Sequence, residues 1–562
     1  MTDQGTFQQQ MEEILDILYP DKDVGLILNR ITQTVEKYQT HPEIVKKRKV
    51  YEDRIVLSED DAVLITYADS IFKEGERPLR TLRRFLKAHV KSAISTVHIL
   101  PFFESSSDGG FSVMDYRQVD PRLGDWHDIQ AIGKDYRLMV DLVLNHVSSR
   151  STWFQGFLKG DRRYQHYFLS FDKPIDVSEV FRPRTHPLLT RFETEMGVKY
   201  VWTTFSHDQI DLNFHHPEVL LEIIDLLIYY LSKGVEFIRL DAIGYVWKEL
   251  DTRCVNLPQT HEIVKLLRTI LEYVAPYAVL VAEVNFPYKE NVSYVEARHE
   301  ASLAYHFALP PIVIDGFIHE DTSILQQETA RIREDLLFMN FLSSHDGIGL
   351  TSAKEILPQD RFETLLETIR ARGGQISYRG SAGSGTPYEL NISYYDAIND
   401  PSNPDTETDV RRFMAASSIA LVDKGIPGIY IHCLLGSRNY TEGVEKTGQK
   451  RMINRERLSY ETLSKDLATP DSIPYQVLNS MVFLLNVRKE IPAFHHSVER
   501  DILSTNLRLF IMERSEEGKN MTAVINVSSE RIPLPQYKGR IDRIRNTSFE
   551  GTVAPYGVYF LE

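Results

Sequence analysis

Four short polar clusters follow apolar runs along this chain. They are Asp141-Leu-Val-Leu-Asn145-His146, Arg239-Leu-Asp241, Glu283-Val-Asn285 and His345-Asp346-Gly347. A lone Asp or His after a strand is as often a capping or turn residue, so one cluster alone predicts little. In a β/α barrel, however, the C-terminal ends of all strands open onto one face. Four such clusters therefore predict one polar pocket in which several carboxylates and histidines meet.

Two of these carboxylates are suited to glycoside chemistry. Arg239 and Asp241 are two apart on a predicted strand, so their side chains share a face, and the cation is expected to keep Asp241 ionised by lowering its pKa. Glu283 has no basic residue within two positions, so burial is expected to raise its pKa. An ionised nucleophile and a proton donor are the pair that a retaining glycoside reaction needs. The alternative for Arg239 and Asp241 is a buried ion pair with an architectural role.

The strands that must carry these clusters are short runs rich in β-branched and aromatic residues. Eight such runs occur, at residues 63–66, 97–100, 139–143, 237–240, 279–282, 304–309, 338–342 and 428–431. Runs that are apolar on both faces predict a parallel sheet covered by helices. No GxGxxG or GxxxxGKS/T motif follows any of them, which disfavours a nucleotide-binding sheet. The predicted fold class is therefore α/β, a (β/α)8 TIM barrel.

Segments around the barrel divide the chain further. A helical N-terminal extension over 1–58 is predicted from apolar residues at helical spacing, namely Ile14, Leu15, Leu18, Leu26, Ile27, Ile31 and Val35. The catalytic barrel is expected to span 59–495, with subdomains inserted after its third and seventh strands at about 149–213 and 347–408. The second insert contains the glycine-rich run 379–385. Alternating apolar runs between polar turns predict a small antiparallel β domain over 496–562.

Composition limits the partners. The chain has 562 residues, and its net charge of −15 disfavours nucleic acid, which is bound by clustered Lys and Arg. Its longest apolar segment, 219–231, contains two acidic residues and is too short to cross a membrane, so no membrane partner is expected. The two cysteines, Cys254 and Cys433, have no metal-binding spacing, and neither a metal nor an organic cofactor is expected. The N-terminus lacks the features of a signal peptide, which favours a cytoplasmic location.

In this order, the four clusters resemble those of the α-amylase superfamily, glycoside hydrolase family 13, over about residues 60–460. Further blocks are most similar to the sucrose phosphorylase subfamily: LITYAD (64–69), HILPFFESSSDGGFSVMDY (98–116), RPR (182–184), VWTTFSHDQIDLN (201–213), RLDAIGYVWKE (239–249), FALPP (307–311), SHDGIG (344–349) and KRMINR (450–455). The resemblance implies a (β/α)8 barrel that acts on α-glucosides with retention of configuration.

The resemblance also implies roles for individual residues. Asp241 is expected to be the nucleophile that forms a β-glucosyl-enzyme, Glu283 the general acid/base, and Asp346 the stabiliser of the transition state. The residues expected to bind substrate are Asp108, His146, Gln209, Arg239, Asn285, His345 and Arg451. Among these, Asp108 and Arg451 are expected to clamp the far hydroxyls of a single glucosyl unit. Arg184 and Tyr388 are expected to face inorganic phosphate, for which a guanidinium group is chemically suited.

The implied activity is that of a retaining glycoside phosphorylase, whose partners are a small glucoside and phosphate and whose product is α-glucose 1-phosphate. Two stretches depart from sucrose phosphorylases: EVN (283–285) replaces EVH, and TPYELN (386–391) replaces LDLYQVN. The helical extension, TPYELN and LGSRNYTEGVEKTG (435–448) resemble glucosylglycerate phosphorylases instead, which implies 2-O-α-glucosylglycerate as the donor. Arg182, Arg184 and Lys446 are the candidates for binding its carboxylate.

Other activities stay open at this level. The nearest alternative is a phosphorylase of sucrose, sucrose 6'-phosphate or glucosylglycerol. A retaining hydrolase or transglucosidase differs from these by releasing glucose without phosphate. A non-catalytic sugar-binding homologue is disfavoured because Asp241, Glu283 and Asp346 are all present. The sequence predicts no oligomeric state.

Overall fold

A closed barrel forms the centre of the structure, a computed structural model that describes residues 4–296, 299–380, 385–503, 505–516 and 519–562. Within these residues its eight parallel strands are β1 (Val63–Thr66), β3 (Thr96–Ile99), β6 (Arg137–Val143), β12 (Val235–Asp241), β13 (Val279–Ala282), β14 (Leu303–Tyr305), β15 (Phe338–Phe341) and β19 (Ile426–Tyr430). Neighbours in the chain are neighbours in the ring, and β1 pairs with both β3 and β19 to close it. The predicted α/β barrel is therefore confirmed.

The run predicted as a strand over 304–309 is shorter in the structure. It contains the end of β14, and its last residue begins helix α10 (Leu309–His319). Pro310 and Pro311 lie in the first turn of α10, where a missing N–H is harmless and the fixed φ favours a helix. Because buried strands and buried helices are both apolar, the hydrophobic pattern alone does not separate them.

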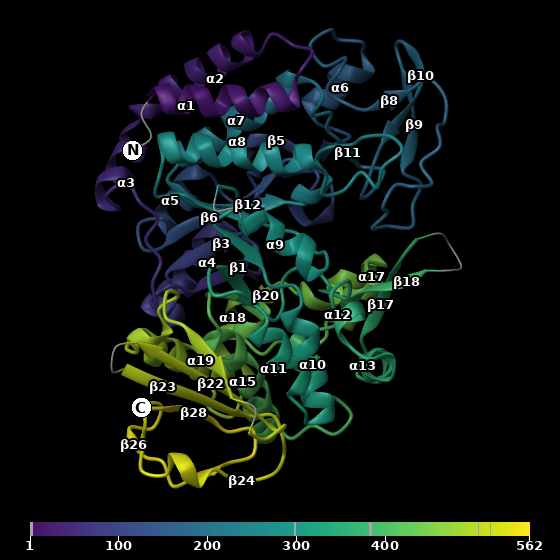
Figure 1. Cartoon of the computed structure of the whole chain (residues 1–562). Helices are drawn as coiled ribbons and strands as arrows, with labels where there is room; N and C mark the ends of the chain where they lie inside the picture. The colour runs from purple at the N-terminus through teal and green to yellow at the C-terminus, as the bar shows by residue number, and fades with distance from the viewer. Residues whose placement is uncertain (1–3, 297–298, 381–384, 504, 517–518) are drawn as a thin grey trace.

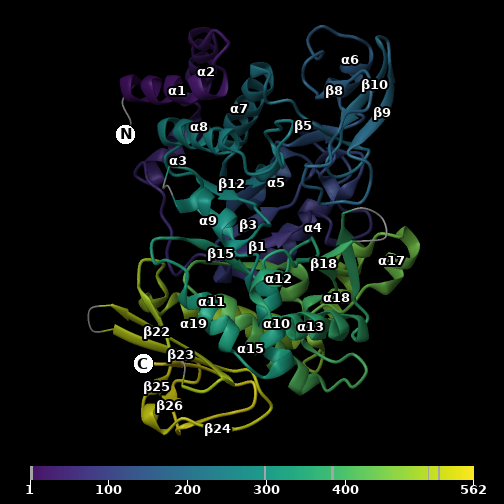
Figure 2. The same cartoon turned by 45° about the vertical axis from the view of Figure 1, so that its right-hand side comes forward.

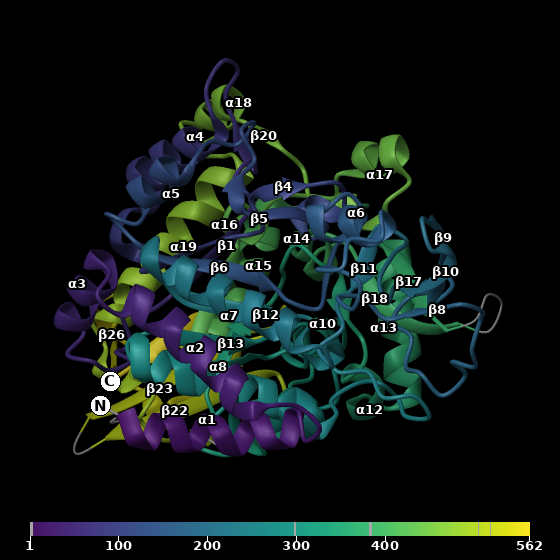
Figure 3. The ribbon, with the colours of Figure 1, turned by 90° about the horizontal axis from the view of Figure 1, so that it is seen from above.

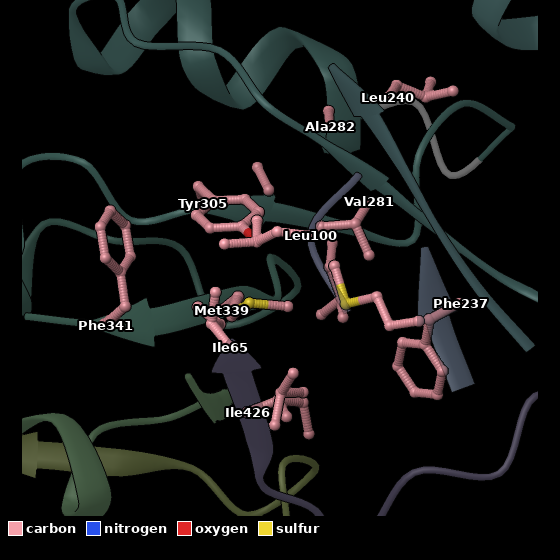
Figure 4. Close-up of a cluster of buried hydrophobic side chains, with 14 of the residues drawn as sticks. Ile65, Leu100, Phe237, Leu240, Val281, Ala282, Tyr305, Met339, Phe341 and Ile426 are labelled. Carbon is pink, nitrogen blue, oxygen red and sulfur yellow. The ribbon is translucent and has the colours of Figure 1, made fainter. Parts of the chain in front are cut away.

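Apolar side chains fill the inside of the barrel. Figure 4 shows Ile65 of β1, Val281 of β13, Tyr305 of β14, Met339 of β15 and Ile426 of β19 gathered together. Each of these side chains is at most 3% exposed. A closely packed core of this kind is hardly compressible, so it holds the strand ends in fixed positions relative to one another.

Helices cover the outside of the barrel. They include α4 (Pro78–Phe85), α5 (Trp126–Ile132), α7 (Pro217–Ser232), α8 (Pro258–Val274), α9 (Tyr288–Glu296), α10, α11 (Ser323–Ala330), α15 (Thr406–Val422) and α19 (Ile473–Lys489). The predicted helix-to-strand step at residue 234 is present, because α7 ends just before Gly234, whose φ is +93°. That left-handed conformation favours glycine and turns the chain directly into β12.

Three N-terminal helices lie on this outer layer: α1 (Gln4–Leu18), α2 (Val24–Gln39) and α3 (Pro42–Val50). Figure 1 shows α1 and α2, in purple, along α7 and α8. The Phe7 ring stacks on Tyr273 of α8 with 4.3 Å between ring centroids, and the Tyr19 hydroxyl donates to the Phe214 carbonyl oxygen at 2.9 Å. The predicted apolar face is buried apart from Leu26, which is 58% exposed.

The two inserts lie on one side of the molecule in Figures 1, 2 and 3. The first contains α6 (Thr152–Leu158), β8 (Ser170–Phe171), β9 (Leu189–Thr194), β10 (Gly197–Trp202) and β11 (Gln209–Asp211). The second contains β16 (Ile348–Gly349), α12 (Ala353–Ile356), α13 (Gln359–Ala371), β17 (Gln375–Arg379), β18 (Thr386–Asn391) and α14 (Tyr394–Ile398). Of the predicted glycine-rich run, residues 381–384 lie outside the described residues. Both inserts follow the barrel strands that the sequence predicts, β6 and β15.

An antiparallel sheet ends the chain, at the bottom of Figure 1. Its strands, in order across the sheet, are β21 (Arg500–Ile502), β22 (Leu509–Glu516), β23 (Lys519–Asn526), β28 (Val558–Leu561), β25 (Ile541–Asp542) and β26 (Thr547–Ser548). The buried Arg500 guanidinium joins this sheet to the barrel through an ion pair of 2.6 Å with Asp423. The limits of the three domains, near residues 58 and 495, stay a prediction.

Two further features of the described residues concern the cysteines and the helices. Cys254 and Cys433 are both free and buried, and burial raises the pKa of both thiols, that of Cys433 to about 12. In the part of the chain that the structure describes, every helix is too short or too polar to cross a membrane.

Candidate active site

A pocket opens at the C-terminal ends of the barrel strands, between the two inserts. It encloses about 710 Å³, including the solvent at its mouth. Eleven of the twelve residues predicted for the site line it: Asp108, His146, Arg184, Gln209, Asp241, Glu283, Asn285, His345, Asp346, Tyr388 and Arg451. The twelfth, Arg239, lies behind the pocket wall and contacts Asp241. The structure therefore brings together residues that are up to 343 positions apart, from Asp108 to Arg451.

Arg239 faces three carboxylates. Its Nη1 atom lies 2.7 Å from Asp241 Oδ1 and 2.5 Å from Asp141 Oδ1, and its Nη2 atom lies 3.8 Å from Glu283 Oε1. Asp141 is held in turn by His98, with 2.8 Å between Oδ2 and Nε2. No role was predicted for His98 or Asp141, although Asp141 opens one of the four clusters. The contacts that link them to Arg239 could not be predicted, because they form only where β3, β6 and β12 lie side by side in the folded barrel.

This arrangement corrects one predicted pKa. Burial raises the pKa of Asp241, and the charges of Glu283 and Asp141 add to that effect, whereas Arg239 opposes it. The pKa of Asp241 is thus raised, and not lowered as Arg239 alone predicts. The pKa of Glu283 is raised as predicted, again chiefly by burial. The prediction for Asp241 considered only its own strand, whereas the two extra carboxylates come from β6 and from the end of β13.

Asp241 and Glu283 therefore titrate as a pair that shares one negative charge over an intermediate pH range. Arg239 donates to Asp241 at 2.7 Å and lies 3.8 Å from Glu283, whose other oxygen accepts from the Ala242 N–H at 2.8 Å. The bond from the guanidinium is charge-assisted and stabilises a carboxylate more than the neutral N–H does, so the proton is favoured on Glu283. One ionised and one protonated carboxyl group form the pair that a retaining glycoside reaction requires.

The third carboxylate, Asp346, is the one of the three whose ionised form is stabilised most. Burial raises its pKa, but Arg451, His345 and Arg455 outweigh that effect and hold the pKa well below its usual range. Arg451 Nη1 lies 2.5 Å from Asp346 Oδ1, and Arg455 Nη2 lies 3.5 Å from the same oxygen. Asp346 is thus a fixed negative charge beside the other two carboxylates, as a stabiliser of positive charge must be.

Asp108 and Arg451, which are expected to clamp the far hydroxyls of the glucosyl unit, both line the pocket but do not pair with each other. Asp108 Oδ1 faces Arg455 Nη1 at 3.9 Å, and its Oδ2 accepts from Gln209 Nε2 at 3.2 Å. Arg451 is bonded instead to Asp346 and, bidentately, to Glu389. Arg455 is therefore a further cation beside Asp108, and the clamp formed by Asp108 and Arg451 stays a prediction. Arg455 is the last residue of the KRMINR block, so the sequence resemblance already contained this residue.

Two histidines complete the inner end of the pocket. His345 lies with its ring stacked on Phe111 at 4.8 Å, and burial lowers its pKa to about 3. Burial also lowers the pKa of His146, whose Nε2 lies 3.1 Å from the Gln209 amide. Both imidazoles are therefore neutral near pH 7 and are available as hydrogen-bonding groups without a net charge.

Aromatic rings that were not predicted individually form the remaining walls. They are Phe111, Phe205, Tyr245, Phe286 and Phe307. The centroids of Phe205 and Tyr245 are 5.2 Å apart, and those of Tyr245 and Phe286 are 5.8 Å apart. Of these rings, only Phe205 comes from the first insert. These rings place apolar surface beside the charged groups, which strengthens the charge interactions in the pocket.

The mouth of the pocket carries Arg184, Tyr388 and Glu389. Arg184 Nη1 lies 3.6 Å from Glu389 Oε1, and its guanidinium carbon lies 5.6 Å from the centre of the Tyr388 ring. Of the other cations considered for an acceptor carboxylate, Arg182 is hydrogen-bonded to the His186 carbonyl oxygen. Neither it nor Lys446 lines the pocket.

The position of Lys446 disfavours it as the cation that binds the acceptor carboxylate. It lies on α17 (Thr441–Thr447), where its ammonium group pairs with Glu442 one turn earlier at 2.6 Å, and both side chains are largely exposed. Only Arg184 of the three predicted candidates is therefore placed to meet an acceptor.

Comparison with known proteins agrees with this geometry. Residues 90–347 match the alpha amylase catalytic domain. The chain is 46% identical to the glucosylglycerate phosphorylase of Spirochaeta thermophila over 84% of this chain and 82% of that protein. It is 36% identical to the glucosylglycerate phosphorylase of Escherichia coli over 99% of this chain and 100% of that protein. The solved sucrose 6F-phosphate phosphorylase of Thermoanaerobacter thermosaccharolyticum superposes with a TM-score of 0.74 at 27% identity, covering 84% of this chain and 95% of that one.

Proposed function

The chain belongs to the α-amylase superfamily and, within it, to the family of the glucosylglycerate phosphorylases, and from this premise we propose that it transfers the α-glucosyl unit of 2-O-α-glucosylglycerate to inorganic phosphate. The products are glycerate and α-glucose 1-phosphate with retained configuration. The observation that carries the proposal is the meeting of Asp241, Glu283 and Asp346 in one pocket whose mouth holds Arg184. We propose a cytoplasmic location as well, in keeping with two unpaired cysteines.

In the first step Asp241 acts as the nucleophile. Its carboxylate oxygen attacks C1 of the glucosyl unit, and the bond from C1 to O2 of glycerate breaks. Glu283 gives its proton to that oxygen, so glycerate leaves with an intact hydroxyl group. Asp346 stabilises the positive charge that develops on the sugar ring, because it stays ionised beside Arg451. The result is a β-glucosyl ester of Asp241.

In the second step phosphate replaces glycerate. A phosphate oxygen attacks C1, the ester bond to Asp241 breaks, and the proton of the attacking phosphate hydroxyl returns to Glu283. Two inversions give the α anomer. Both steps use only side chains, and the chemistry requires neither a metal nor an organic cofactor. Asp108 and Arg451, which both line the pocket, support the binding of a single glucosyl unit.

A donor screen with inorganic phosphate tests the proposal. The purified chain is expected to release glucose 1-phosphate from glucosylglycerate with a kcat/KM at least about tenfold higher than from sucrose, sucrose 6'-phosphate or glucosylglycerol, a difference of about 1.4 kcal/mol. In the reverse reaction, kcat/KM must likewise be higher with glycerate as the acceptor than with fructose. Ready release from sucrose and none from glucosylglycerate would instead assign the enzyme to sucrose. Glucose release without phosphate would indicate a hydrolase.

A further inference from the structure

His98 is a buried imidazole behind the catalytic carboxylates, and the proposed mechanism gives it no task. It stands on β3, where its neighbours across the sheet are Ile65 of β1 and Met139 of β6, and its side chain is fully buried. Its Nε2 atom lies 2.8 Å from Asp141 Oδ2. Burying an imidazole costs free energy unless it is hydrogen-bonded, so the position of His98 depends on its contact with Asp141.

In this contact the proton of His98 is favoured on Nε2. The other ring nitrogen, Nδ1, is buried without a hydrogen-bond partner among the described residues, so an N–H there would be left unsatisfied. Burial raises the pKa of Asp141, but His98 and Arg239 outweigh that effect and hold the pKa below its usual range. Asp141 is therefore an ionised acceptor, and the imidazole N–H is directed at one of its two oxygens.

Asp141 and the nucleophile share one nitrogen atom of Arg239. Its Nη1 atom donates to Asp141 Oδ1 at 2.5 Å and to Asp241 Oδ1 at 2.7 Å. An Nη atom carries two protons, so each carboxylate receives one of them. Because His98 holds Asp141 Oδ2, only Oδ1 is left for the guanidinium. The Nε atom of Arg239 is buried without a partner among the described residues, so a released Asp141 has a further donor on the same group to turn to.

We propose that His98 is a positioning residue for the nucleophile, because it holds Asp141 in the orientation that leaves one N–H of Arg239 directed at Asp241. This inference rests on the proposed function, in which Asp241 attacks C1 as a carboxylate. Without His98, Asp141 is expected to turn further onto the guanidinium and to draw it away from Asp241. Asp241 then loses part of its charged hydrogen bond, and its ionised form becomes less stable.

Several other titratable or charged groups interact with Asp141, Arg239 and Asp241 from the surrounding elements. They are Tyr116 of β5 (Val113–Val119), Glu283 after β13, Tyr305 of β14, and His345 and Asp346 after β15. Among the described residues, however, the side chains that donate a hydrogen bond to Asp141 are those of His98 and Arg239. A substitution at His98 therefore acts on the nucleophile through Asp141 and leaves the groups that line the pocket in place.

The pH dependence of glucosyl-enzyme formation tests this inference. The probe is α-glucosyl fluoride without phosphate, because this donor does not titrate and the acid limb of its kcat/KM follows the ionisation of Asp241. His98→Leu is expected to move that limb to higher pH by about half a unit or more, which lowers kcat/KM on the acid side about threefold or more. His98→Gln keeps an N–H donor and should recover most of the shift. In the matched control, His261→Leu, the limb should stay in place, because His261 contacts Glu300 at the same 2.8 Å but does not line the pocket.

Asp141→Asn separates this role from a disturbance of the fold. The charge of Asp141 raises the pKa of Asp241, so the neutral amide should move the acid limb to lower pH, opposite to His98→Leu. In that background His98→Leu should add no further shift, because His98 acts through Asp141. The double variant leaves no ionised Asp141 without its donor, so it provides the test where His98→Leu alone does not fold.

The outcomes for the inference and for the proposed function are distinct. An acid limb that is unchanged or lowered in His98→Leu would overturn the inference. A further shift in the Asp141→Asn background, or an equal shift in His261→Leu, would overturn it as well. A wild-type chain that forms no glucosyl-enzyme from α-glucosyl fluoride would instead contradict the proposed function.

Discussion

At the scale of single residues, the Arg239 guanidinium decides which carboxyl group carries charge. It lies 2.7 Å from Asp241 and 3.8 Å from Glu283, so the negative charge is favoured on Asp241 and the proton on Glu283. The two roles thus depend on unequal partners, since Asp241 has the charged bond to Arg239 whereas Glu283 accepts from the neutral Ala242 N–H at 2.8 Å. Each role can be removed by a substitution that keeps the shape of the side chain.

Asp241→Asn removes the nucleophile while preserving its size. Turnover of glucosylglycerate with phosphate is expected to fall by about 10⁴-fold, because no ester with the glucosyl unit forms. Intact-protein mass after incubation with α-glucosyl fluoride should show no added glucosyl group, whereas Glu283→Gln should accumulate it. Circular dichroism is expected to match the wild type. Substantial turnover by Asp241→Asn would remove Asp241 from the nucleophilic role.

Glu283→Gln is expected to stabilise the protein at high pH. The pKa of Glu283 is raised in the fold, chiefly by burial, so its contribution to stability is complete below the ordinary pKa of a carboxyl group and is lost as pH rises through the folded pKa. Glutamine removes that loss. Thermal unfolding should therefore give a melting temperature about 1–3 °C above the wild type at pH 8 and an equal one near pH 4.5. A lower melting temperature at pH 8 would contradict the raised pKa.

At the scale of elements, one carboxylate ties the first insert to the loop that carries Asp108. Asp208 accepts hydrogen bonds from the hydroxyl groups of Ser106, Ser112 and Ser149, the last at 2.5 Å, and from that of Ser107. Ser107 directly precedes Asp108, and Asp208 directly precedes Gln209, which donates to Asp108 at 3.2 Å. Asp208 is therefore a positioning residue for the end of the pocket that Asp108 and Gln209 line.

Asp208→Ala is expected to loosen that end of the pocket. The serine hydroxyls lose a shared acceptor, so kcat/KM for glucosylglycerate should fall about tenfold or more, mainly through KM, with a smaller change in the KM for phosphate. Asp172→Ala is the matched control, because Asp172 lies in the same insert and its side chain is 87% exposed. A loss of phosphate affinity as large as the loss of donor affinity would show a general disturbance of the mouth.

The N-terminal helices offer a prediction of stability without loss of chemistry. Phe7 is 1% exposed and stacks on Tyr273 of α8, on the outer layer and away from the pocket. Phe7→Ala is expected to lower the free energy of unfolding of the unit that includes α1 by about 3 kcal/mol, with kcat/KM unchanged at 25 °C. Ile17→Ala, at a side chain that is 54% exposed, should change stability little. Denaturant unfolding followed by tryptophan fluorescence and activity measures both effects.

At the scale of the whole molecule, the barrel was predictable because its signal is local. Each strand is a run of apolar residues. Strands that are consecutive in the chain usually lie side by side in a parallel sheet, so eight such runs predict a ring of eight strands in chain order. The pocket followed from the same rule, since Asp241, Glu283 and Asp346 all stand at strand ends. Sequence therefore predicted which residues meet.

Which arginine pairs with which carboxylate in the pocket was not predictable in the same way. Arg451 and Arg455 come from a 3₁₀ turn, Lys450–Asn454, and the residue after it, where spacing by four does not return a side chain to the same face. The choice of partner for Asp108 is then made by tertiary packing. The raised pKa of Asp241 was missed for a similar reason, because burial and the carboxylates of Glu283 and Asp141, which come from other strands, depend on the folded barrel.

The burial of both cysteines has a practical consequence for following this enzyme at work. With Cys254 and Cys433 enclosed and their thiols kept protonated, maleimide reagents at neutral pH find little native thiolate to attack. A cysteine introduced at Tyr378, which is 40% exposed on the hairpin beside the mouth, would accept a fluorophore at a single position. Emission from that dye would report the arrival of each acceptor anion in real time, without first removing any native cysteine.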